Sequence, residues 1–324
     1  MDIQTFIKVI NFYGRFTPTY TKIGYFARGL FLRNYAKNYA GERWLITGAS
    51  GGIGRAMVIA AATAGADVVA VARSESKLKA LIANVPVDAR HRVSYEVADM
   101  SLQSDTQELL DRLITGGTFN ILLNNVGVLF PEMTITKEGR EATFVTNLLS
   151  HYILTEGLAA NKKIAAGGAI INMTSGGMYN MPLGVRKLNV LEAAKYNGKT
   201  VYAAHKRGQV VLTGYWNAKF KDAGIQAYVM HPGWTKTPGV KSALPTFYKV
   251  QNLLLRTPYQ GGETALWLAS TRPSSSDDPD AGVWLDRRLR AAHVYDFTKT
   301  RQCTVEEFVA FLDAEVANGP GPLV

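Results

Sequence analysis

The chain has 324 residues, 47% of them hydrophobic, which is enough for one large core or two ordinary ones. Its single cysteine, Cys303, excludes an intramolecular disulfide, and the lack of CxxC and HExxH sequences argues against a redox dithiol or a metal site. The histidines show no metal-ligand spacing; they are His91, His151, His205, His231 and His293. We therefore expect no metal and a reducing compartment such as the cytoplasm.

Residues 1–40 differ from the rest of the chain, because they carry about half of its net charge of +10. The segment has six basic residues against one acid, Asp2, and ten aromatic residues lie among the cations. It has neither the continuous apolar core of a signal peptide nor the ~20 apolar residues of a membrane span. Two roles stay open: peripheral contact with an anionic membrane, or packing as helices over the domain that follows.

From residue 41 onward, short apolar runs alternate with longer helical patterns, which predicts βαβ units and a parallel sheet. Strands are expected at 43–47, 67–72, 93–97, 121–124, 169–173, 225–230 and 282–285. Helices are expected at 55–64, 75–85 and 102–114. An amphipathic helix is expected after Thr304, with Val305, Phe308, Val309, Leu312 and Val316 on one face.

These elements predict a single Rossmann-type α/β domain, with a doubly wound parallel sheet of about seven strands and helices on both faces. The domain is expected to span residues 41–300. It follows the N-terminal helical extension, 1–40, and precedes a C-terminal helix and tail, 301–324. No internal repeat or linker divides it.

The first chemical signal is the glycine-rich turn TGASGGIG at 47–54, between the first strand and the first helix. Glycines at 48, 52 and 54 allow the backbone to turn tightly and to approach a pyrophosphate, whose charge is met by unpaired amides and the positive end of the helix. Glycine-rich turns also occur without a ligand, but this position within a βαβ unit favours nucleotide binding.

The TGxxxGxG spacing resembles that of the short-chain dehydrogenase/reductase family, and further motifs follow in the family's order. These are Asp99, NNVG at 124–127, Asn147, Ser175, YAAHK at 202–206 and HPGWTKT at 231–237. Val126 and Thr235 depart from the residues usual in the family. The strings at 175–178, 201–213, 230–240 and 284–287 are similar to one branch in particular. The resemblance implies an oxidoreductase that uses a nicotinamide dinucleotide.

The resemblance also implies four catalytic residues, Asn147, Ser175, Tyr202 and Lys206. Tyr202 and Lys206 are four residues apart on a predicted helix, so they lie on one face. A nearby ammonium and an oxidised nicotinamide would lower the phenol pKa from ~10, which suits a proton donor or acceptor. Lys206 would also hold the nicotinamide ribose, Ser175 would polarise the substrate oxygen, and Asn147 would fix a water that relays the proton. Taken singly, each residue also suits a structural role.

The end of the second strand bears on the choice of cofactor. NAD-binding proteins usually have an acidic side chain there, whereas this chain has Ala72 followed by Arg73, whose guanidinium can pair with a 2′-phosphate. The prediction is NADP(H), with NAD(H) left open and a solvated loop arginine as the alternative. The expected cofactor-binding residues are Thr47, Gly48, Ser50, Gly51, Gly52, Ile53, Gly54, Arg73, Asp99, Met100, Asn125, Val126, Gly127, Tyr202, Lys206, Pro232, Gly233, Thr235 and Thr237.

Residues 234–257 are the expected substrate segment. Its bulky apolar residues are Trp234, Leu244, Phe247, Tyr248, Leu253 and Leu254. They suit a large hydrophobic carbonyl or alcohol, such as a steroid, an isoprenoid or a long-chain aldehyde. The interval between Ser175 and Tyr202 is longer than in compact family members, so residues 178–199 are expected to form an inserted loop near the pocket mouth.

Two other functions stay open. One is a catalytically inactive protein that senses NADP(H), although the complete set of Ser175, Tyr202 and Lys206 argues against it. The other is a sugar-nucleotide epimerase or dehydratase, which shares the Tyr and Lys but normally has TGxxGxxG spacing and a larger C-terminal domain. No motif points to nucleic acid, and a homo-oligomer is left open.

Overall fold

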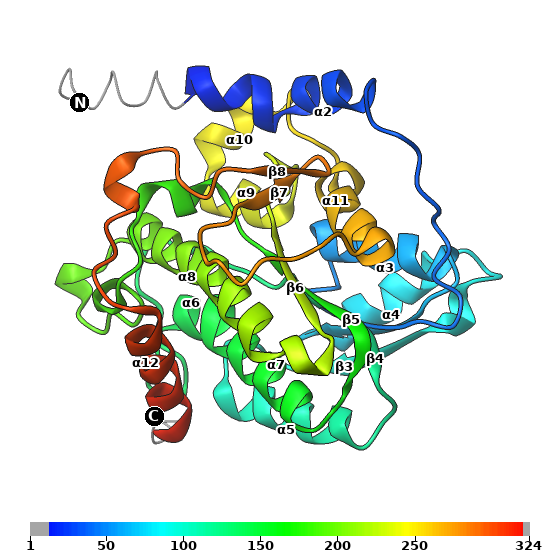
Figure 1. The fold of residues 1–324 in the computed structure, drawn as a ribbon, viewed down its shortest axis with the longest axis horizontal. Helices are drawn as coiled ribbons and strands as arrows, with labels where there is room; N and C mark the ends of the chain where they lie inside the picture. The colour runs from blue at the N-terminus through cyan, green and yellow to red at the C-terminus, as the bar shows by residue number, and fades with distance from the viewer. Residues whose placement is uncertain (1–12, 320–324) are drawn as a thin grey trace.

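The structure, a computed structural model, describes residues 13–319 (Figure 1). Residues 1–12 of the predicted extension and 320–324 of the predicted tail lie outside the described residues. Eight strands form one sheet in the order β3-β2-β1-β4-β5-β6-β7-β8. They are β1 (Arg43–Thr47), β2 (Asp67–Ala72), β3 (Val93–Val97), β4 (Phe119–Asn124), β5 (Ile164–Met173), β6 (Gln226–Met230), β7 (Val283–Leu285) and β8 (Arg288–Arg290).

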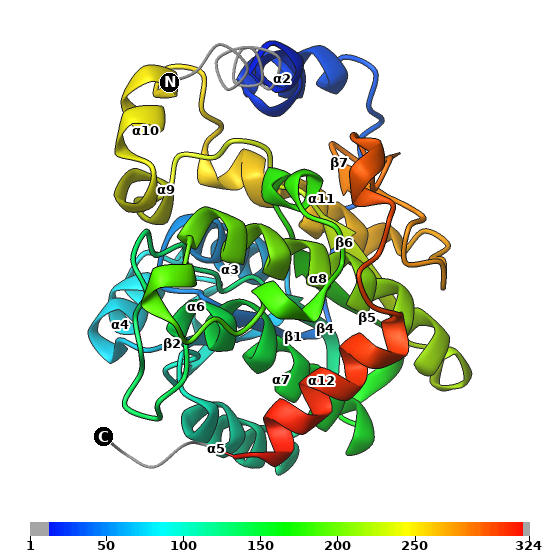
Figure 2. The ribbon, with the colours of Figure 1, turned by 90° about the vertical axis from the view of Figure 1, so that its left-hand side faces the viewer.

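Helices cover both faces of this sheet. The helices are α2 (Lys22–Gly29), α3 (Gly52–Thr63), α4 (Glu75–Ala83), α5 (Gln103–Ile114), α6 (Ala142–Phe144), α7 (Ser150–Ala160), α8 (Gly198–Lys219), α9 (Pro238–Ala243), α10 (Pro245–Gln251), α11 (Pro258–Thr271) and α12 (Val305–Ala317). Two of them, α2 and α10, lie at one end of the molecule (Figures 1 and 2). The α/β architecture predicted from the alternation of apolar and helical patterns is confirmed.

Strands β1 to β7 pair in parallel, and β1, β2 and β3 have the predicted bounds. β4 and β5 begin two and five residues before the predicted positions, 121 and 169. The number of strands is eight rather than about seven. The additional strand, β8, runs antiparallel to β7 after a turn in which Asp286 and Arg287 have φ of 49° and 57°. Positive φ at both central residues is typical of a tight hairpin turn.

Alternate residues of each strand point to opposite faces of the sheet, so each face has its own core. In β1, Leu45 belongs to the core formed with α5, α7, α8 and α12. Its neighbours Trp44 and Ile46 belong to the core formed with α3, α4 and α11. Figures 1 and 2 show these two helical layers on either side of the sheet.

The described part of the N-terminal extension packs against the domain. Phe16 and Tyr20 are buried in a third core with Tyr179, from the predicted insertion, and Leu285 of β7. Further along, the hydroxyl of the buried Tyr39 donates to the backbone oxygen of Leu266 in α11, at 3.0 Å. Packing over the domain, one of the two predicted roles of this segment, is therefore what its described residues show.

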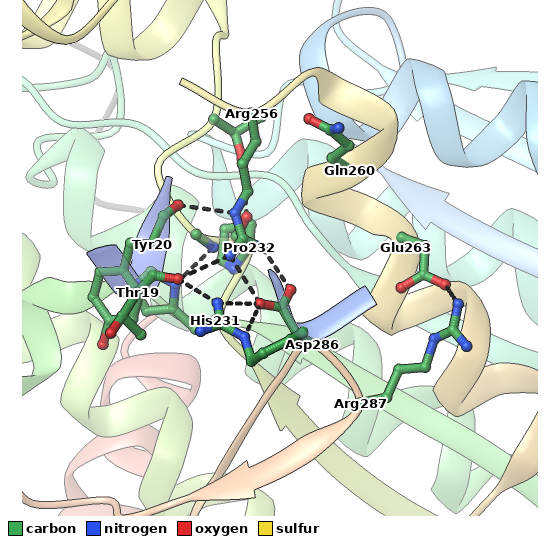
Figure 3. Close-up of polar contacts among 12 residues, drawn as sticks. Thr19, Tyr20, His231, Pro232, Arg256, Gln260, Glu263, Asp286 and Arg287 are labelled. Atoms are coloured by element: carbon green, nitrogen blue, oxygen red, sulfur yellow. Dashed lines mark hydrogen bonds and ion pairs between the residues drawn. The ribbon is translucent and has the colours of Figure 1, made fainter. Parts of the chain in front are cut away.

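A buried cluster of charges holds the extension in place (Figure 3). Arg256, 1% exposed, donates to both carboxylate oxygens of Asp286, at 2.7 and 3.0 Å, and to the backbone oxygens of Thr19 and Tyr20, at 3.1 and 2.8 Å. Arg28 of α2 also donates to Asp286, with Nε 2.7 Å from Oδ2. We call Arg28, Arg256 and Asp286 the Asp286 clamp. It ties α2 to the β7–β8 turn.

Candidate active site

The glycine-rich turn lies between β1 and α3, at the point where the strand order reverses between β1 and β4. Gly48 and Gly52 have positive φ (65° and 51°), which glycine adopts without strain. A Cβ at Gly54 would lie 2.3 Å from the Gly48 carbonyl oxygen, so no other residue fits there. Because α3 begins at Gly52, its first amides face this crevice, where open α/β sheets bind ligands.

Asn125 ties the end of β4 to this turn. Its Nδ2 donates to the Thr47 backbone oxygen at 2.7 Å. The Thr47 hydroxyl oxygen in turn accepts from the amides of Asn125 and Val126, both at 3.1 Å. A Cβ at Gly48 would lie 2.8 Å from the Val126 Cα, so these residues are in close contact. The structure thus brings the predicted pyrophosphate turn and the NNVG motif together.

Arg73 and Asp99 follow the neighbouring strands β2 and β3. The Arg73 side chain is 72% exposed, and its Nη1 lies 4.0 Å from Asp99 Oδ2, at the outer limit of an ion pair. Asp99 Oδ1 accepts from the amide and hydroxyl of Ser101, at 3.0 and 2.7 Å. An exposed pair at this distance contributes little, so the Arg73 guanidinium remains available to an anionic ligand.

Three predicted catalytic residues lie together between β5 and α8. Lys206 Nζ is 5.5 Å from the centre of the Tyr202 ring, on the same face of α8. It donates to the backbone oxygen of Met173, the last residue of β5, at 2.7 Å. The Ser175 hydroxyl forms a hydrogen bond with the Tyr202 phenol and accepts from the Gly177 amide at 3.1 Å. A phenol, an amine and a hydroxyl, all three predicted to be catalytic, thus share one site.

Burial decides the protonation of this group. It raises the pKa of the Tyr202 phenol, against the weaker opposing effect of the Ser175 hydrogen bond. It also lowers the pKa of Lys206 to about 7. Desolvation of the phenolate thus dominates in the chain by itself, and the lowering of the Tyr202 pKa by the Lys206 ammonium together with an oxidised nicotinamide stays a prediction for the cofactor-bound site. Near pH 7, Tyr202 is a neutral phenol.

Asn147 lies in a π-helical turn, Val145–Leu149, between α6 and α7. Its Oδ1 accepts from the Val128 amide at 2.7 Å, and its Nδ2 donates to the Val128 oxygen at 2.8 Å, so the side chain holds the loop after β4. A Cβ at Gly127 would lie 3.4 Å from Asn147 Oδ1 and 3.5 Å from Lys206 Nζ. Asn147 is therefore next to Lys206, but its carboxamide is engaged by the backbone.

Gln209 belongs to the same group, and the sequence analysis missed it. It is 1% exposed and lies one turn after Lys206 on α8. Its Oε1 accepts from Lys206 Nζ at 3.1 Å, and its Nε2 donates to the Asn147 backbone oxygen at 2.8 Å. Nε2 is also 3.1 Å from Nδ1 of the buried His151. The available signal was a polar residue at i+3 from Lys206 on the face of a largely buried helix.

The loop after β6 crosses the glycine-rich turn. A Cβ at Gly52 would lie 3.2 Å from Thr237 Cγ2, so Thr237, one of the predicted cofactor-binding residues, faces the turn. Thr235 instead donates its hydroxyl to the Pro232 backbone oxygen at 3.0 Å and packs against Gly261 of α11. Ile53 also directs its side chain toward Gly261. Two predicted cofactor-binding residues, Thr235 and Ile53, thus have side chains that contact α11.

Aromatic side chains from three segments meet beside this loop. Trp234 lies 5.1 Å from Phe247 of α10 and 5.7 Å from Tyr13, between ring centres. Tyr20 stacks on His231 at 4.2 Å. We call these five residues the aromatic wall. The sequence predicted that Trp234 and Phe247 act together, but not that Tyr13 and Tyr20 of the extension join them. No group of acids, histidines and cysteines able to hold a metal occurs within residues 13–319.

Comparison with known proteins agrees with these motifs. Residues 42–187 match the family model described as short chain dehydrogenase. "Dehydrogenase/reductase SDR family member 12" of Bos taurus is 31% identical over 89% of this chain and 94% of its own length, and the Homo sapiens protein is 30% identical over 85% and 90%. Retinol dehydrogenase 13 of Homo sapiens is 26% identical over 71% of this chain and 72% of its own length.

Solved structures share the fold. A short chain dehydrogenase from Burkholderia cenocepacia, in complex with NADP, matches 72% of this chain and 92% of its own with a TM-score of 0.58 at 23% identity. One from Salmonella enterica matches 74% and 95% with a TM-score of 0.59 at 20% identity. The member 12 proteins are the branch whose strings the chain resembles at 201–213 and 230–240. By sequence identity over nearly its whole length, this chain belongs to the short-chain dehydrogenase/reductase family.

Proposed function

We propose that the chain is an NADP(H)-dependent carbonyl reductase or alcohol dehydrogenase. The observation that carries this proposal is the grouping of Ser175, Tyr202 and Lys206 at the carboxyl end of β5, beside the glycine-rich turn. NADPH supplies the hydride when bound. In reduction, the neutral Tyr202 phenol donates its proton to the substrate oxygen, while the Ser175 hydroxyl donates a hydrogen bond to the same atom as charge develops there.

The residues present fit a dinucleotide. A Cβ at Gly54 would fill the turn that has to admit the pyrophosphate, and the α3 amides meet its charge. Lys206 would hold the nicotinamide ribose. Gln209 links Lys206 to the Asn147 backbone by hydrogen bonds, so both residues would lie along the path by which the proton reaches solvent. The exposed Arg73 guanidinium favours NADP(H), because it can pair with the 2′-phosphate. NADP is also the dinucleotide named for the Burkholderia cenocepacia structure.

A large apolar substrate is part of the proposal. The aromatic wall presents bulky rings next to the loop after β6, as expected of a site for a steroid, an isoprenoid or a long-chain aldehyde. Retinol, the alcohol in the name of the relative retinol dehydrogenase 13, is also a large hydrophobic molecule. The inactive sensor and the epimerase or dehydratase gain no support from the comparisons. A cytoplasmic location, a homo-oligomer and membrane contact of residues 1–40 remain separate proposals.

Tyr202→Phe tests the chemistry. Turnover of a hydrophobic ketone with NADPH should fall by about two to four orders of magnitude, because the proton donor is lost, while the Kd for NADPH should change little. Tyr215→Phe, on the same helix, is the control and should retain activity. NADPH binding without any turnover by the unaltered protein would instead support the inactive sensor.

Arg73→Ala tests the cofactor. A charge-assisted contact to phosphate contributes roughly 1.5–3 kcal/mol, so the Kd for NADPH should rise about tenfold or more. The Kd for NADH is the internal control, because NADH lacks the 2′-phosphate. Equal changes for both cofactors, measured by fluorescence titration, would contradict the assigned role of Arg73.

A further inference from the structure

Six exposed apolar side chains gather on α2 and at the end of α10, away from the catalytic group. On α2 and just beyond it they follow helical spacing, at i, i+3 and i+7, with one further residue adjacent. All six are between 54% and 85% exposed. We call them the apolar face: Ile23, Phe26, Leu30, Phe31, Val250 and Leu253.

The two segments form one surface. The Lys22 amide donates to the Leu254 oxygen at 2.9 Å, and Lys22 Nζ lies 3.5 Å from the Leu253 oxygen. Figures 1 and 2 both show α2 and α10 at the same end of the molecule. The inner side of α2 is used for folding, because a Cβ at Gly24 would clash with backbone oxygens and Arg28 enters the Asp286 clamp. On the outward side, Phe26 and Leu30 line a pocket together with Glu263 and Arg287.

This concentration of apolar exposure is unusual. Of the 13 large hydrophobic residues exposed in the described part of the chain, six belong to the apolar face. The remaining seven are distributed over other elements: Val87, Val97, Ile135, Leu191, Tyr259, Leu289 and Phe297. A contiguous apolar patch on a protein surface is typical of an interaction site, whereas scattered apolar residues are not.

Charge indicates the partner. Residues 13–34 and 236–257 contain no Asp or Glu and eight Lys or Arg. Arg28 and Arg256 are engaged by Asp286; the other six are Arg15, Lys22, Arg33, Lys236, Lys241 and Lys249. Apolar side chains among cations suit an anionic lipid surface, because the apolar side chains enter the interface and the cations pair with the headgroups. A second copy would bring positive charge against positive charge across a two-fold axis.

We propose that the apolar face, with cations of the same two segments, docks on a bilayer that contains anionic phospholipid. No helix within residues 13–319 is long and apolar enough to cross a membrane. The docking surface differs from the contact expected through residues 1–40, because it includes α10 and uses only the outward side of α2. Phe247 of α10 also belongs to the aromatic wall, so the docked membrane would lie next to the proposed substrate segment.

Vesicle flotation without substrate or cofactor tests the proposal independently of the proposed reaction. The full chain should bind phosphatidylcholine vesicles that contain phosphatidylserine, and binding should weaken at high salt. Phe26→Ser with Leu253→Ser should reduce the bound-to-unbound ratio at least tenfold. Lys241→Glu with Lys249→Glu should do the same. The matched control, Val87→Ser with Leu191→Ser, removes equally exposed apolar residues elsewhere and should bind as the unaltered chain does.

The unfolding temperature of each variant should stay within a few degrees of that of the unaltered chain, since these side chains are exposed. A variant that loses binding while remaining folded supports the proposal. Recovery of the unaltered chain in the unbound fraction with and without phosphatidylserine would overturn it. So would light scattering that shows a dimer dissociated by Phe26→Ser with Leu253→Ser, because the face would then join two copies.

Discussion

At the scale of single residues, Lys206 depends on the neutral oxygens around it. Burial lowers its pKa to about 7, and Gln209 Oε1 is one of two acceptors that stabilise its charged form. Gln209→Leu removes that acceptor and should lower the Lys206 pKa further, whereas Gln209→Glu adds a carboxylate and should raise it. If charged Lys206 supports turnover, activity falls as pH rises through this pKa. The alkaline limb of kcat should therefore move to lower pH in Gln209→Leu and to higher pH in Gln209→Glu.

The alkaline limb of kcat is expected to move in opposite directions in the two variants, which distinguishes a positioning role of Gln209 from a packing role. A purely structural residue would lower kcat in both variants and leave the limb in place. Gln209→Asn, which keeps a shorter amide, is the conservative variant and should restore part of the original profile. Displacement of the limb in the same direction for Leu and Glu would contradict the assignment.

At the scale of elements, the β7–β8 turn anchors α2 through the Asp286 clamp. Asp286 neutralises two arginines, and removing one partner of a buried pair typically costs about 3–5 kcal/mol. Asp286→Asn should therefore lower the free energy of unfolding by that amount in urea titrations. Asparagine tolerates the positive φ of this position, so the backbone contribution stays small.

Asp67→Asn is the control for this prediction. Asp67 pairs with Arg92 at 3.2 Å, but its side chain is 62% exposed, so the loss should be within about 1 kcal/mol. Equal effects of Asp286→Asn and Asp67→Asn would show that the clamp is not a structural anchor of α2.

At the scale of the whole molecule, three buried histidines predict acid instability. Burial lowers the pKa of His151 and His231 to about 3 and that of His205 to about 4. Between these values and the ordinary 6.5, the unfolded chain binds protons that the folded chain does not, so stability falls as pH falls. Each histidine contributes up to about 1.4 kcal/mol per pH unit. Urea titrations at pH 7 and 5.5 should show a clear loss.

The exposed His91 serves as the control for this effect. His91→Asn changes an exposed side chain and should alter the unfolding free energy by no more than about 0.5 kcal/mol at pH 7. Equal stability at pH 7 and 5.5 would show that the three histidines are not buried in their neutral form.

Local patterns along the chain were enough to predict the succession of βαβ units, the exact bounds of β1, β2 and β3, and the order of the family motifs. These depend on local information, since alternation, glycine spacing and helix periodicity act over a few residues. β8 was not predicted, because its three residues, Arg-Leu-Arg, contain no apolar run. Its pairing with β7 depends on the turn at Asp286 and Arg287.

The contacts between distant segments are visible only in the folded chain. Tyr13 and Tyr20 reach Trp234 and His231 across some two hundred residues, and Gln209 meets Asn147 between two helices. The Tyr202 pKa likewise depends on how completely the folded chain removes water from the phenol, which spacing along a helix does not reveal. Contacts and desolvation arise only when distant segments pack together, whereas the motifs follow from the order of neighbouring residues.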